Sequence, residues 1–167
     1  MKNIVLIGMP GCGKTTLGKL IAKRLGADFF DADEETEKNS KMKISEIFSK
    51  LGEAAFRDLE HKTLCILSNK QGSVISTGGG CVERKDNITR LRKNGIIVFI
   101  DRSVSDILSD INSENRPLLK GNVSALRQLY ERRFPLYKEF CDIHIKNTDS
   151  IDEVCEKIIL EVNKNGR

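Results

Sequence analysis

The chain alternates short runs of apolar residues with longer stretches in which apolar positions recur every three or four residues. Short continuous apolar runs are typical of buried strands, and the longer period is typical of amphipathic helices. This alternation predicts an α/β domain in which strands and helices follow one another. We expect strands at residues 3–7, 28–33, 73–77, 96–101 and 142–145.

The segments between these strands carry the predicted helices. After the first strand, Leu17, Leu20, Ile21 and Leu25 mark one helical face, and Gly26 follows as a helix-ending glycine would. Further helices are expected over residues 53–68, 86–93 and 151–162, with shorter pieces over 34–51 and after 101, and with a helix from Val123 that Pro135 should kink or interrupt.

The segment after the first strand carries the strongest chemical signal. Residues 8–15 read Gly-Met-Pro-Gly-Cys-Gly-Lys-Thr and match G-x-x-x-x-G-K-[ST], a phosphate-binding loop between strand and helix. Its glycines let the backbone turn its N–H groups toward phosphate oxygens, and the helix N-terminus adds a partial positive charge. Lys14 can neutralise the β- and γ-phosphates and Thr15 can ligate Mg²⁺. The motif predicts a nucleoside triphosphate bound by Gly11, Cys12, Gly13, Lys14, Thr15 and Thr16.

Three aspartates lie where predicted strands end, which is the edge where ligands bind in open α/β sheets. Asp31 and Asp33 stand two residues apart. We expect the first to hold the Mg²⁺ shell and the second to face the hydroxyl of an acceptor. The alternative is that either acid only caps the following helix. Asp101 resembles the acid of a Walker B strand and competes with Asp31 for the metal.

Two arginines and a glycine run are candidates for binding the acceptor. Arg57 has Glu53 and Glu60 one helical turn away, which alone indicates a solvated ion-pair face. Arg133 lies on the apolar stripe of its helix, where an unpaired charge is unfavourable. Residues 78–80 are three glycines directly after a strand, where a ligand can approach the backbone closely.

Residues 112–122 form a polar connection between two predicted helices. The stretch contains Arg116 and few apolar anchors. A connection of this kind is typical of an active-site lid, so we expect it to be mobile and to close over bound substrates.

Composition narrows the class of partner. The 167 residues suit one domain, and 28 basic against 24 acidic residues leave a net charge of only +4. That balance suits a small anionic substrate, and with no Trp and two Tyr we expect no nucleic acid. The longest apolar run, residues 96–100, is too short to span a membrane. Five scattered cysteines and an N-terminus that leads directly into the first strand predict a reduced cytoplasmic protein without structural zinc or a signal peptide.

Several motifs occur in a fixed order, and together they resemble those of shikimate kinases over nearly the whole chain. The phosphate loop is shared by many NTPases, whereas the later motifs are more specific. The resemblance implies one domain over residues 1–167, with a parallel sheet of order 2-3-1-4-5 flanked by helices and a substrate-binding helical region at about 33–62. The later motifs are Asp31-x-Asp33, Phe56-Arg57-x-x-Glu60, Gly78-Gly79-Gly80, Arg116-Pro117-Leu118-Leu119 and Arg133-x-Pro135-Leu136-Tyr137.

The resemblance also implies a reaction and roles for individual residues. A monomeric enzyme would transfer the γ-phosphate of ATP to the 3-hydroxyl of shikimate with Mg²⁺, in aromatic amino-acid biosynthesis. Lys14, Thr15 and Arg116 would act on the phosphates and the metal. Asp31 would help to place Mg²⁺ through water, which makes Asp101 a structural strand end. Shikimate would be held by Asp33, Arg57, Gly78, Gly79, Gly80 and Arg133, with Asp33 orienting the attacking hydroxyl and the two arginines forming a fork for the carboxylate.

Two positions depart from the family pattern. Cys81 follows the glycine run where the family usually has Ala, which is a small change. Ser109 stands seven residues before Arg116, where the family commonly has an Arg against adenine. The adenine contact is therefore not accounted for.

Other kinds of protein share parts of this pattern. Gluconate kinases and nucleoside monophosphate kinases use the same scaffold, and gluconate also combines a carboxylate with hydroxyls. A nucleotide-binding regulatory module would keep the loop without transferring phosphate. The acid pair and the second basic cluster argue against such a module.

Overall fold

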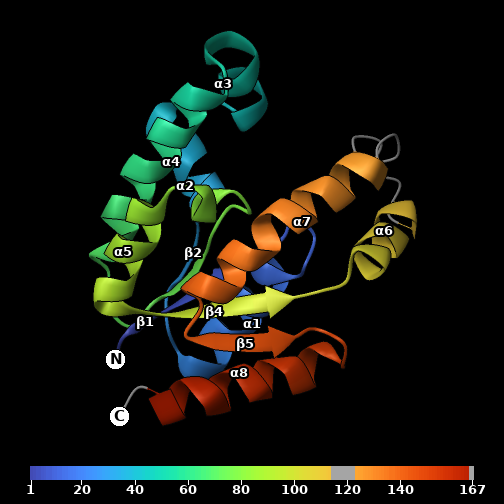
Figure 1. Cartoon of the computed structure of the whole chain (residues 1–167). Coiled ribbons are helices and arrows are strands. Elements are labelled where there is room, and N and C mark those ends of the chain that lie inside the picture. Colours follow the sequence, from blue (N-terminus) through green and yellow to red (C-terminus); the bar gives the residue numbers. More distant parts are fainter. Residues whose placement is uncertain (114–122, 166–167) are drawn as a thin grey trace.

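A five-stranded parallel sheet forms the centre of the computed structural model, which describes residues 1–113 and 123–165 (Figure 1). The strand order β2-β3-β1-β4-β5 confirms the implied topology. The three central strands are almost wholly buried, because helices cover both faces, and this burial explains their continuous apolar runs. The strands are β1 (Asn3–Ile7), β2 (Phe29–Asp31), β3 (Val74–Ser76), β4 (Gly95–Asp101) and β5 (Ile143–Lys146).

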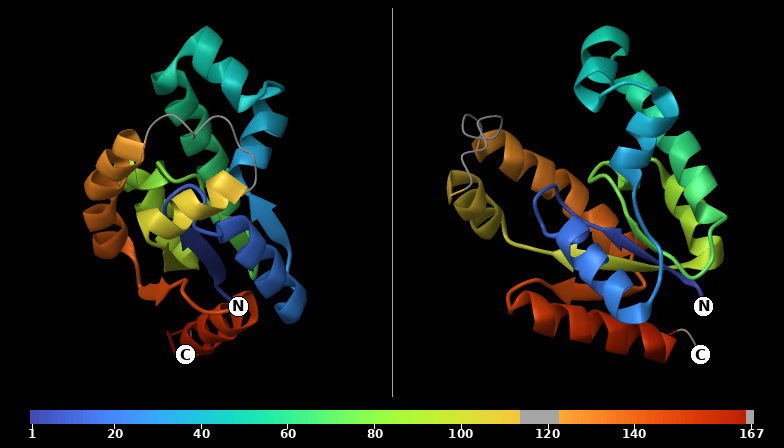
Figure 2. Two further views of the ribbon diagram at one scale, coloured as in Figure 1. Left: turned by 90° about the vertical axis from the view of Figure 1, so that its right-hand side faces the viewer. Right: turned by 180° about the vertical axis from the view of Figure 1, so that it is seen from behind.

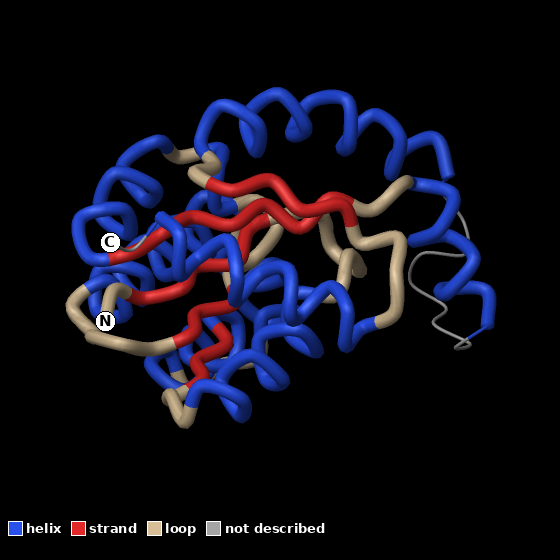
Figure 3. The backbone as a smooth tube through the Cα atoms, turned by 90° about the horizontal axis from the view of Figure 1, so that it is seen from below, coloured by secondary structure: helices blue, strands red, loops and turns tan. Residues whose placement is uncertain are grey.

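Helices cover the sheet from two sides. Helices α1 and α8 pack on one face and α4, α5 and α7 on the other, so that the sheet runs through the middle of the molecule (Figure 3). The helices are α1 (Lys14–Leu25), α2 (Ala32–Ser40), α3 (Ile44–Leu51), α4 (Glu53–Ser68), α5 (Lys85–Asn94), α6 (Val104–Ser113), α7 (Val123–Phe140) and α8 (Ile151–Asn165), with a 3-10 turn at Cys81–Glu83. No helix in the described ranges is long and apolar enough to cross a membrane.

Two groups of helices rise beyond the carboxyl ends of the strands. Helices α2, α3 and α4 pack against one another on one side, and α6 packs against α7 on the other (Figure 2). The first group coincides with the helical region that was expected to bind the acceptor.

The expectation of a strand through Asp33 is wrong. Strand β2 ends at Asp31, and Asp33 lies in the first turn of α2. The reason is local, because Asp31 Oδ1 accepts hydrogen bonds from the backbone N–H groups of Asp33 and Glu34 at 3.0 and 3.4 Å. Such a cap starts a helix immediately after the strand. Asp31 therefore stands at the end of a strand, and Asp33 stands in the first turn of the helix that follows.

Pro135 was expected to kink or interrupt its helix, and the structure shows no interruption, since α7 continues through it. Proline removes one helical hydrogen bond. Leu126 before it and Tyr137 and Phe140 after it are all buried in the core, and this packing holds the helix on both sides. The predicted lid and Arg116 lie outside the described residues, except that residues 112 and 113 end α6.

Candidate active site

The register of the parallel strands aligns the ends of three of them. Leu6 of β1 and Asp31 of β2 both pair with Ser76 of β3. Because the phosphate loop begins two residues after Leu6, the loop, Asp31 and the glycine run meet at one edge of the sheet. A cavity of about 570 Å³ opens there, and we call it the phosphate cavity. Its lining includes Lys14, Thr15, Asp31, Asp33, Gly78 and Gly79.

The phosphate loop has the backbone that its glycines predict. Gly11 and Gly13 have φ values of 80° and 100°, which side-chain-bearing residues rarely adopt. Lys14 is only 7% exposed, and its ammonium donates to the carbonyls of Gly8 and Met9 at 2.8 and 2.9 Å. These two acceptors hold the charge at the wall of the phosphate cavity, where it can meet phosphate oxygens.

The remaining loop residues divide between the cavity and the core. Gly11, Gly13 and Thr16 line the phosphate cavity. Cys12 is fully buried, and its Sγ lies 3.7 Å from Lys14 Nζ. A contribution of Cys12 to phosphate binding would therefore come from its backbone.

Thr15 and Asp31 present two oxygens suited to a magnesium ion. Thr15 Oγ1 donates to Asp31 Oδ2 at 2.8 Å and lies 3.4 Å from Ser76 Oγ. Hydroxyl and carboxylate oxygens are ligands that Mg²⁺ prefers, and Mg²⁺ usually completes its shell with water and substrate phosphates. Within the part of the chain that the structure describes, no cluster of three or more His, Cys, Asp or Glu side chains forms a metal site. The donor set thus fits Mg²⁺ brought with phosphates.

Asp101 does not line the phosphate cavity. Its Oδ2 lies 2.8 Å from His144 Nε2 of β5, and its charge acts on the hydroxyl of Tyr130 in α7. Burial, with the Asp101 charge, raises the pKa of Tyr130 above its usual value. These contacts tie β4, β5 and α7 together, which is the structural role that the resemblance implied for this acid.

Asp33 is placed against the glycine run. A Cβ at Gly78 would lie 3.0 Å from Asp33 Oδ1 and 2.8 Å from Glu60 Oε1, so both carboxylates lie close to the backbone of the glycine run. Burial is the main cause that raises the pKa of Asp33, and the nearby charge of Asp31 raises it further. A carboxylate with a raised pKa accepts a proton more readily than an ordinary carboxylate.

The backbone of the glycine run is held from the opposite side. Tyr137 is fully buried, and its hydroxyl donates to the carbonyl of Gly79 at 2.6 Å. A Cβ on Gly79 would press on the ring of Pro10 in the phosphate loop, at 2.7 Å from its Cδ. The glycine run and the phosphate loop are therefore in close contact.

Arg57 lies directly over Gly80. A Cβ on Gly80 would collide with its guanidinium. Arg57 Nη1 donates to Glu60 Oε2 at 2.9 Å. Glu60 is 1% exposed, and its Oε1 is the one buried side-chain oxygen or nitrogen among the described residues that has no hydrogen-bond partner. Burial raises the pKa of Glu60, against the opposing charge of Arg57.

The structure brings Arg57 and Arg133 together on Glu83, an acid to which sequence analysis assigned no role. Arg133 is 6% exposed, and its Nε donates to Glu83 Oε1 at 3.2 Å. Arg57 Nη2 lies 3.9 Å from Glu83 Oε2. Burial alone would raise the pKa of Glu83, but Arg133 and Arg132 lower it below its usual range. Neither Arg57 nor Arg133 lines the phosphate cavity, and Arg57 lies against Gly80 at the end of the glycine run.

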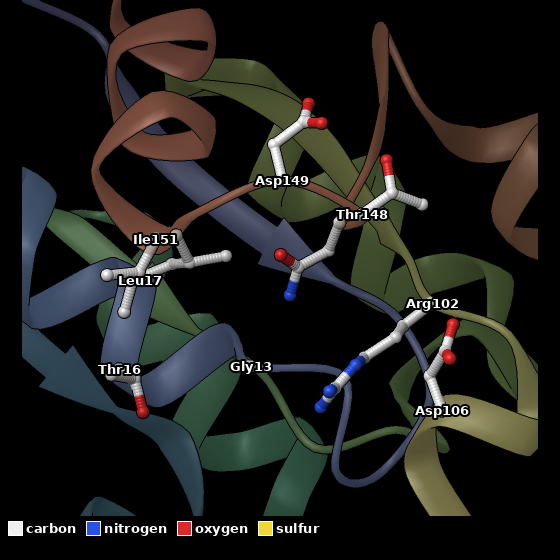
Figure 4. Close-up of a pocket in the computed structure, with 9 residues that line it drawn as sticks. Gly13, Thr16, Leu17, Arg102, Asp106, Thr148, Asp149 and Ile151 are labelled. Atoms are coloured by element: carbon white, nitrogen blue, oxygen red, sulfur yellow. The ribbon is translucent and has the colours of Figure 1, made fainter.

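A second cavity of about 570 Å³ lies beside the first, between the start of α1 and the loop from β5 to α8 (Figure 4). Sequence analysis did not single out the residues of this cavity beyond the phosphate loop. One signal for Arg102 was available, because it directly follows the acid that ends β4. The lining includes Gly13, Thr16, Arg102, Asp106, Asn147 and Asp149.

The family model for shikimate kinase matches residues 10–163. The chain belongs to the shikimate kinase family. The shikimate kinase of Thermodesulfovibrio yellowstonii is 45% identical, over 100% of this chain and 99% of its own. That of Clostridium botulinum is also 45% identical, over 95% of this chain and 96% of its own. A solved shikimate kinase from Acinetobacter baumannii, in complex with shikimate, has a TM-score of 0.90 at 34% identity and covers 99% of this chain and 94% of that one. Family membership confirms the prediction of a kinase of the shikimate pathway that uses ATP with Mg²⁺.

Proposed function

We propose that the chain transfers the γ-phosphoryl group of ATP to the 3-hydroxyl of shikimate, using groups gathered around the phosphate cavity. One observation carries the assignment of roles. The phosphate loop and the Asp31–Asp33 pair line one cavity, and Arg57, which shares Glu83 with Arg133, lies against Gly80, next to the two glycines that line this cavity. This arrangement supports a donor side and an acceptor side that adjoin each other.

The donor side consists of the loop, Lys14, Thr15 and Asp31. Phosphoryl transfer requires charge neutralisation and in-line positioning more than covalent chemistry. Lys14 would neutralise the β- and γ-phosphates, and the oxygens of Thr15 and Asp31 would hold Mg²⁺, the latter through water. When bound, Mg²⁺ supplies further neutralisation of phosphate charge.

The acceptor side consists of Asp33, the glycine run and the two arginines. Arg57 and Arg133 would bind the carboxylate of shikimate, since paired guanidinium groups match a carboxylate. Glu83 already neutralises part of their charge and holds them together. Asp33 would accept a hydrogen bond from the attacking hydroxyl and orient it, and its raised pKa would help it to take the proton. Gly78, Gly79 and Gly80 would let the ring approach the backbone.

Three further expectations belong to this proposal. Arg116, which lies outside the described residues, would act on the transferring phosphate from the predicted lid. The enzyme would be a monomer, which is supported by donor and acceptor groups that come from one chain. It would work in the cytoplasm, where its free cysteines would stay reduced.

The test is an acceptor comparison. ADP release is measured with ATP and Mg²⁺ on adding shikimate, gluconate or a nucleoside monophosphate in turn. We expect release with shikimate only. Release with gluconate or the monophosphate would assign the acceptor site to another substrate class, and no release with any acceptor would favour a regulatory module. Light scattering of the same sample measures the expected mass of one chain, 18.8 kDa.

A further inference from the structure

The second cavity adjoins the phosphate cavity. The two share Gly13, Thr16 and Arg102. ATP with its phosphates on the loop must place its nucleoside in adjoining space, and about 570 Å³ is enough for a small ligand of that size. The inference that follows rests on the proposal that ATP is the donor.

Arg102 stands at the boundary between the two cavities. Its side chain is 22% exposed and extends toward Gly13 (Figure 4). Its Nη1 donates to Asp110 Oδ2 at 2.5 Å and to the carbonyl of Gly11 at 3.4 Å. The ion pair with Asp110 of α6 and the contact with the phosphate loop hold the guanidinium at this boundary. Because a guanidinium has five N–H donors and two flat faces, these contacts leave surface for a ligand.

The opposite wall of the second cavity is also tied to the phosphate loop. Asn147, just after β5, donates from Nδ2 to the carbonyl of Cys12 at 2.9 Å. A Cβ on Gly13 would lie 2.9 Å from the same nitrogen. The space between Arg102 and Asn147 therefore has walls that are fixed relative to the phosphates.

Ser109 does not supply the contact that the family pattern assigns to its position. Its side chain is exposed, and its hydroxyl donates to the carbonyl of Asp106 in its own helix at 2.9 Å. Among the described residues that line the second cavity, Arg102 alone carries a positive charge. Arg102, which follows β4, therefore supplies a positive charge beside the phosphate loop, whereas Ser109 on α6 supplies none.

We propose that Arg102 binds the nucleoside end of ATP, with the plane of its guanidinium against the base. An arginine plane on an aromatic ring combines stacking with a cation–π attraction. The phosphate loop recognises only phosphates, so Arg102 is the described group best placed to add affinity for the nucleoside. In this chain Arg102 replaces an arginine that would otherwise come from α6.

Calorimetric titration with ADP, inorganic tripolyphosphate and shikimate tests this assignment. Arg102→Ala should weaken ADP binding by about 2- to 30-fold, the range expected for one cation–π contact. It should leave tripolyphosphate and shikimate binding unchanged. Arg102→Lys keeps the charge and loses the plane, so it should also weaken ADP binding. The matched control is Arg90→Ala, which removes another ion-paired arginine, on α5, that lines neither cavity.

Each contrary result overturns a different statement. Unchanged ADP binding in Arg102→Ala overturns the inference, and equal loss for ADP and tripolyphosphate assigns the contact to phosphates instead. Full ADP affinity in Arg102→Lys would show that the guanidinium plane is not needed. If Arg102→Ala does not fold, Arg102→Lys still tests the proposal, because ADP binding should weaken in it as well. A wild-type protein that binds shikimate but not ADP would instead contradict the proposed function.

Discussion

Thr15 Oγ1 donates a 2.8 Å hydrogen bond to Oδ2 of Asp31, and this bond joins the phosphate loop to the end of β2. The other oxygen, Oδ1, accepts from the backbone N–H groups of Asp33 and Glu34 and caps α2. One carboxylate therefore binds the phosphate loop with one oxygen and caps α2 with the other. The two hypotheses for Asp31, a metal ligand or a helix cap, are compatible.

Substitutions of Asp31 should separate these two roles. Asp31→Asn keeps an oxygen for the cap, so the free energy of unfolding should change little, whereas the Mg²⁺ concentration needed for half-maximal turnover should rise. Asp31→Ala should in addition lose about 0.5–2 kcal/mol of stability, the usual cost of a lost N-cap. Urea unfolding measures the stability of each variant, and turnover measured at increasing Mg²⁺ concentration gives its Mg²⁺ requirement. An unchanged Mg²⁺ requirement in Asp31→Asn would argue that Asp31 is only a cap.

Lys14→Met should abolish most activity without unfolding the protein. The ammonium of Lys14 is buried against two carbonyls, and methionine has a similar shape without the charge. Loss of one transition-state donor typically lowers the rate by about 10²–10³. Circular dichroism confirms folding and a coupled ADP assay measures the rate. A folded variant with normal turnover would show that Lys14 does not act on the phosphates.

Arg57→Ala should weaken shikimate binding and leave ATP binding nearly unchanged. Removing one side of a buried charged contact costs about 2–5 kcal/mol. The matched control is Arg132→Ala, because Arg132 also pairs with Glu83 but its side chain is 63% exposed. This control should change shikimate binding far less. If Arg57→Ala weakened ATP binding and left shikimate binding unchanged, the assignment of the arginine pair to shikimate would be wrong.

Gly80→Ala should imitate Arg57→Ala in part. A Cβ at Gly80 meets the end of a flexible side chain, so the guanidinium of Arg57 can move aside and the fold should survive. The expected result is weaker shikimate binding with ATP binding retained. Gly79→Ala should differ, because its Cβ meets Pro10 of the phosphate loop, and ATP binding should fall as well. Identical effects of the two variants on both ligands would contradict this placement.

Asp33→Asn should lose activity and gain stability at neutral pH. The pKa of Asp33 is raised in the folded protein from its usual 3.8, mainly by burial. Folding thus favours the protonated acid, so the free energy of unfolding falls as pH rises from about 3.8 through the raised pKa. Asparagine carries no charge, so at pH values above this range Asp33→Asn should be more stable than the wild type. Below pH 3.8 Asp33 is protonated in both the folded and the unfolded state, and the two proteins should be equally stable. Turnover should fall by about 10²–10⁴ if Asp33 is the proton acceptor.

Thermal melts at several pH values and pH–rate profiles check the last prediction. The wild-type rate should fall on the acid side as Asp33 takes up a proton. Stability that is lower for Asp33→Asn than for the wild type at pH 7 would contradict the sign derived from burial.

The sequence by itself determined the local parts of this protein. The apolar runs of β1 and β4 predicted buried strands, because strands covered on both faces leave no polar positions. Residues 8–15 predicted the phosphate loop and its tight backbone turn, and the positive φ values of Gly11 and Gly13 show why glycine is required there. Such features depend on residues close together in the chain, where spacing alone is informative.

Only the tertiary structure decided which distant side chains meet. Asp31 and Asp101 both end strands, yet the fold brings Asp31 to Thr15 at the start of α1 and Asp101 to His144 of β5. The meeting of Arg57 and Arg133 on Glu83 depends on how α4 and α7 pack around the 3-10 turn after β3. The place of Arg102 between two cavities likewise follows from packing of β4, α1 and the loop after β5. Contacts of this kind are set by packing between elements far apart in the chain, which residue spacing does not encode.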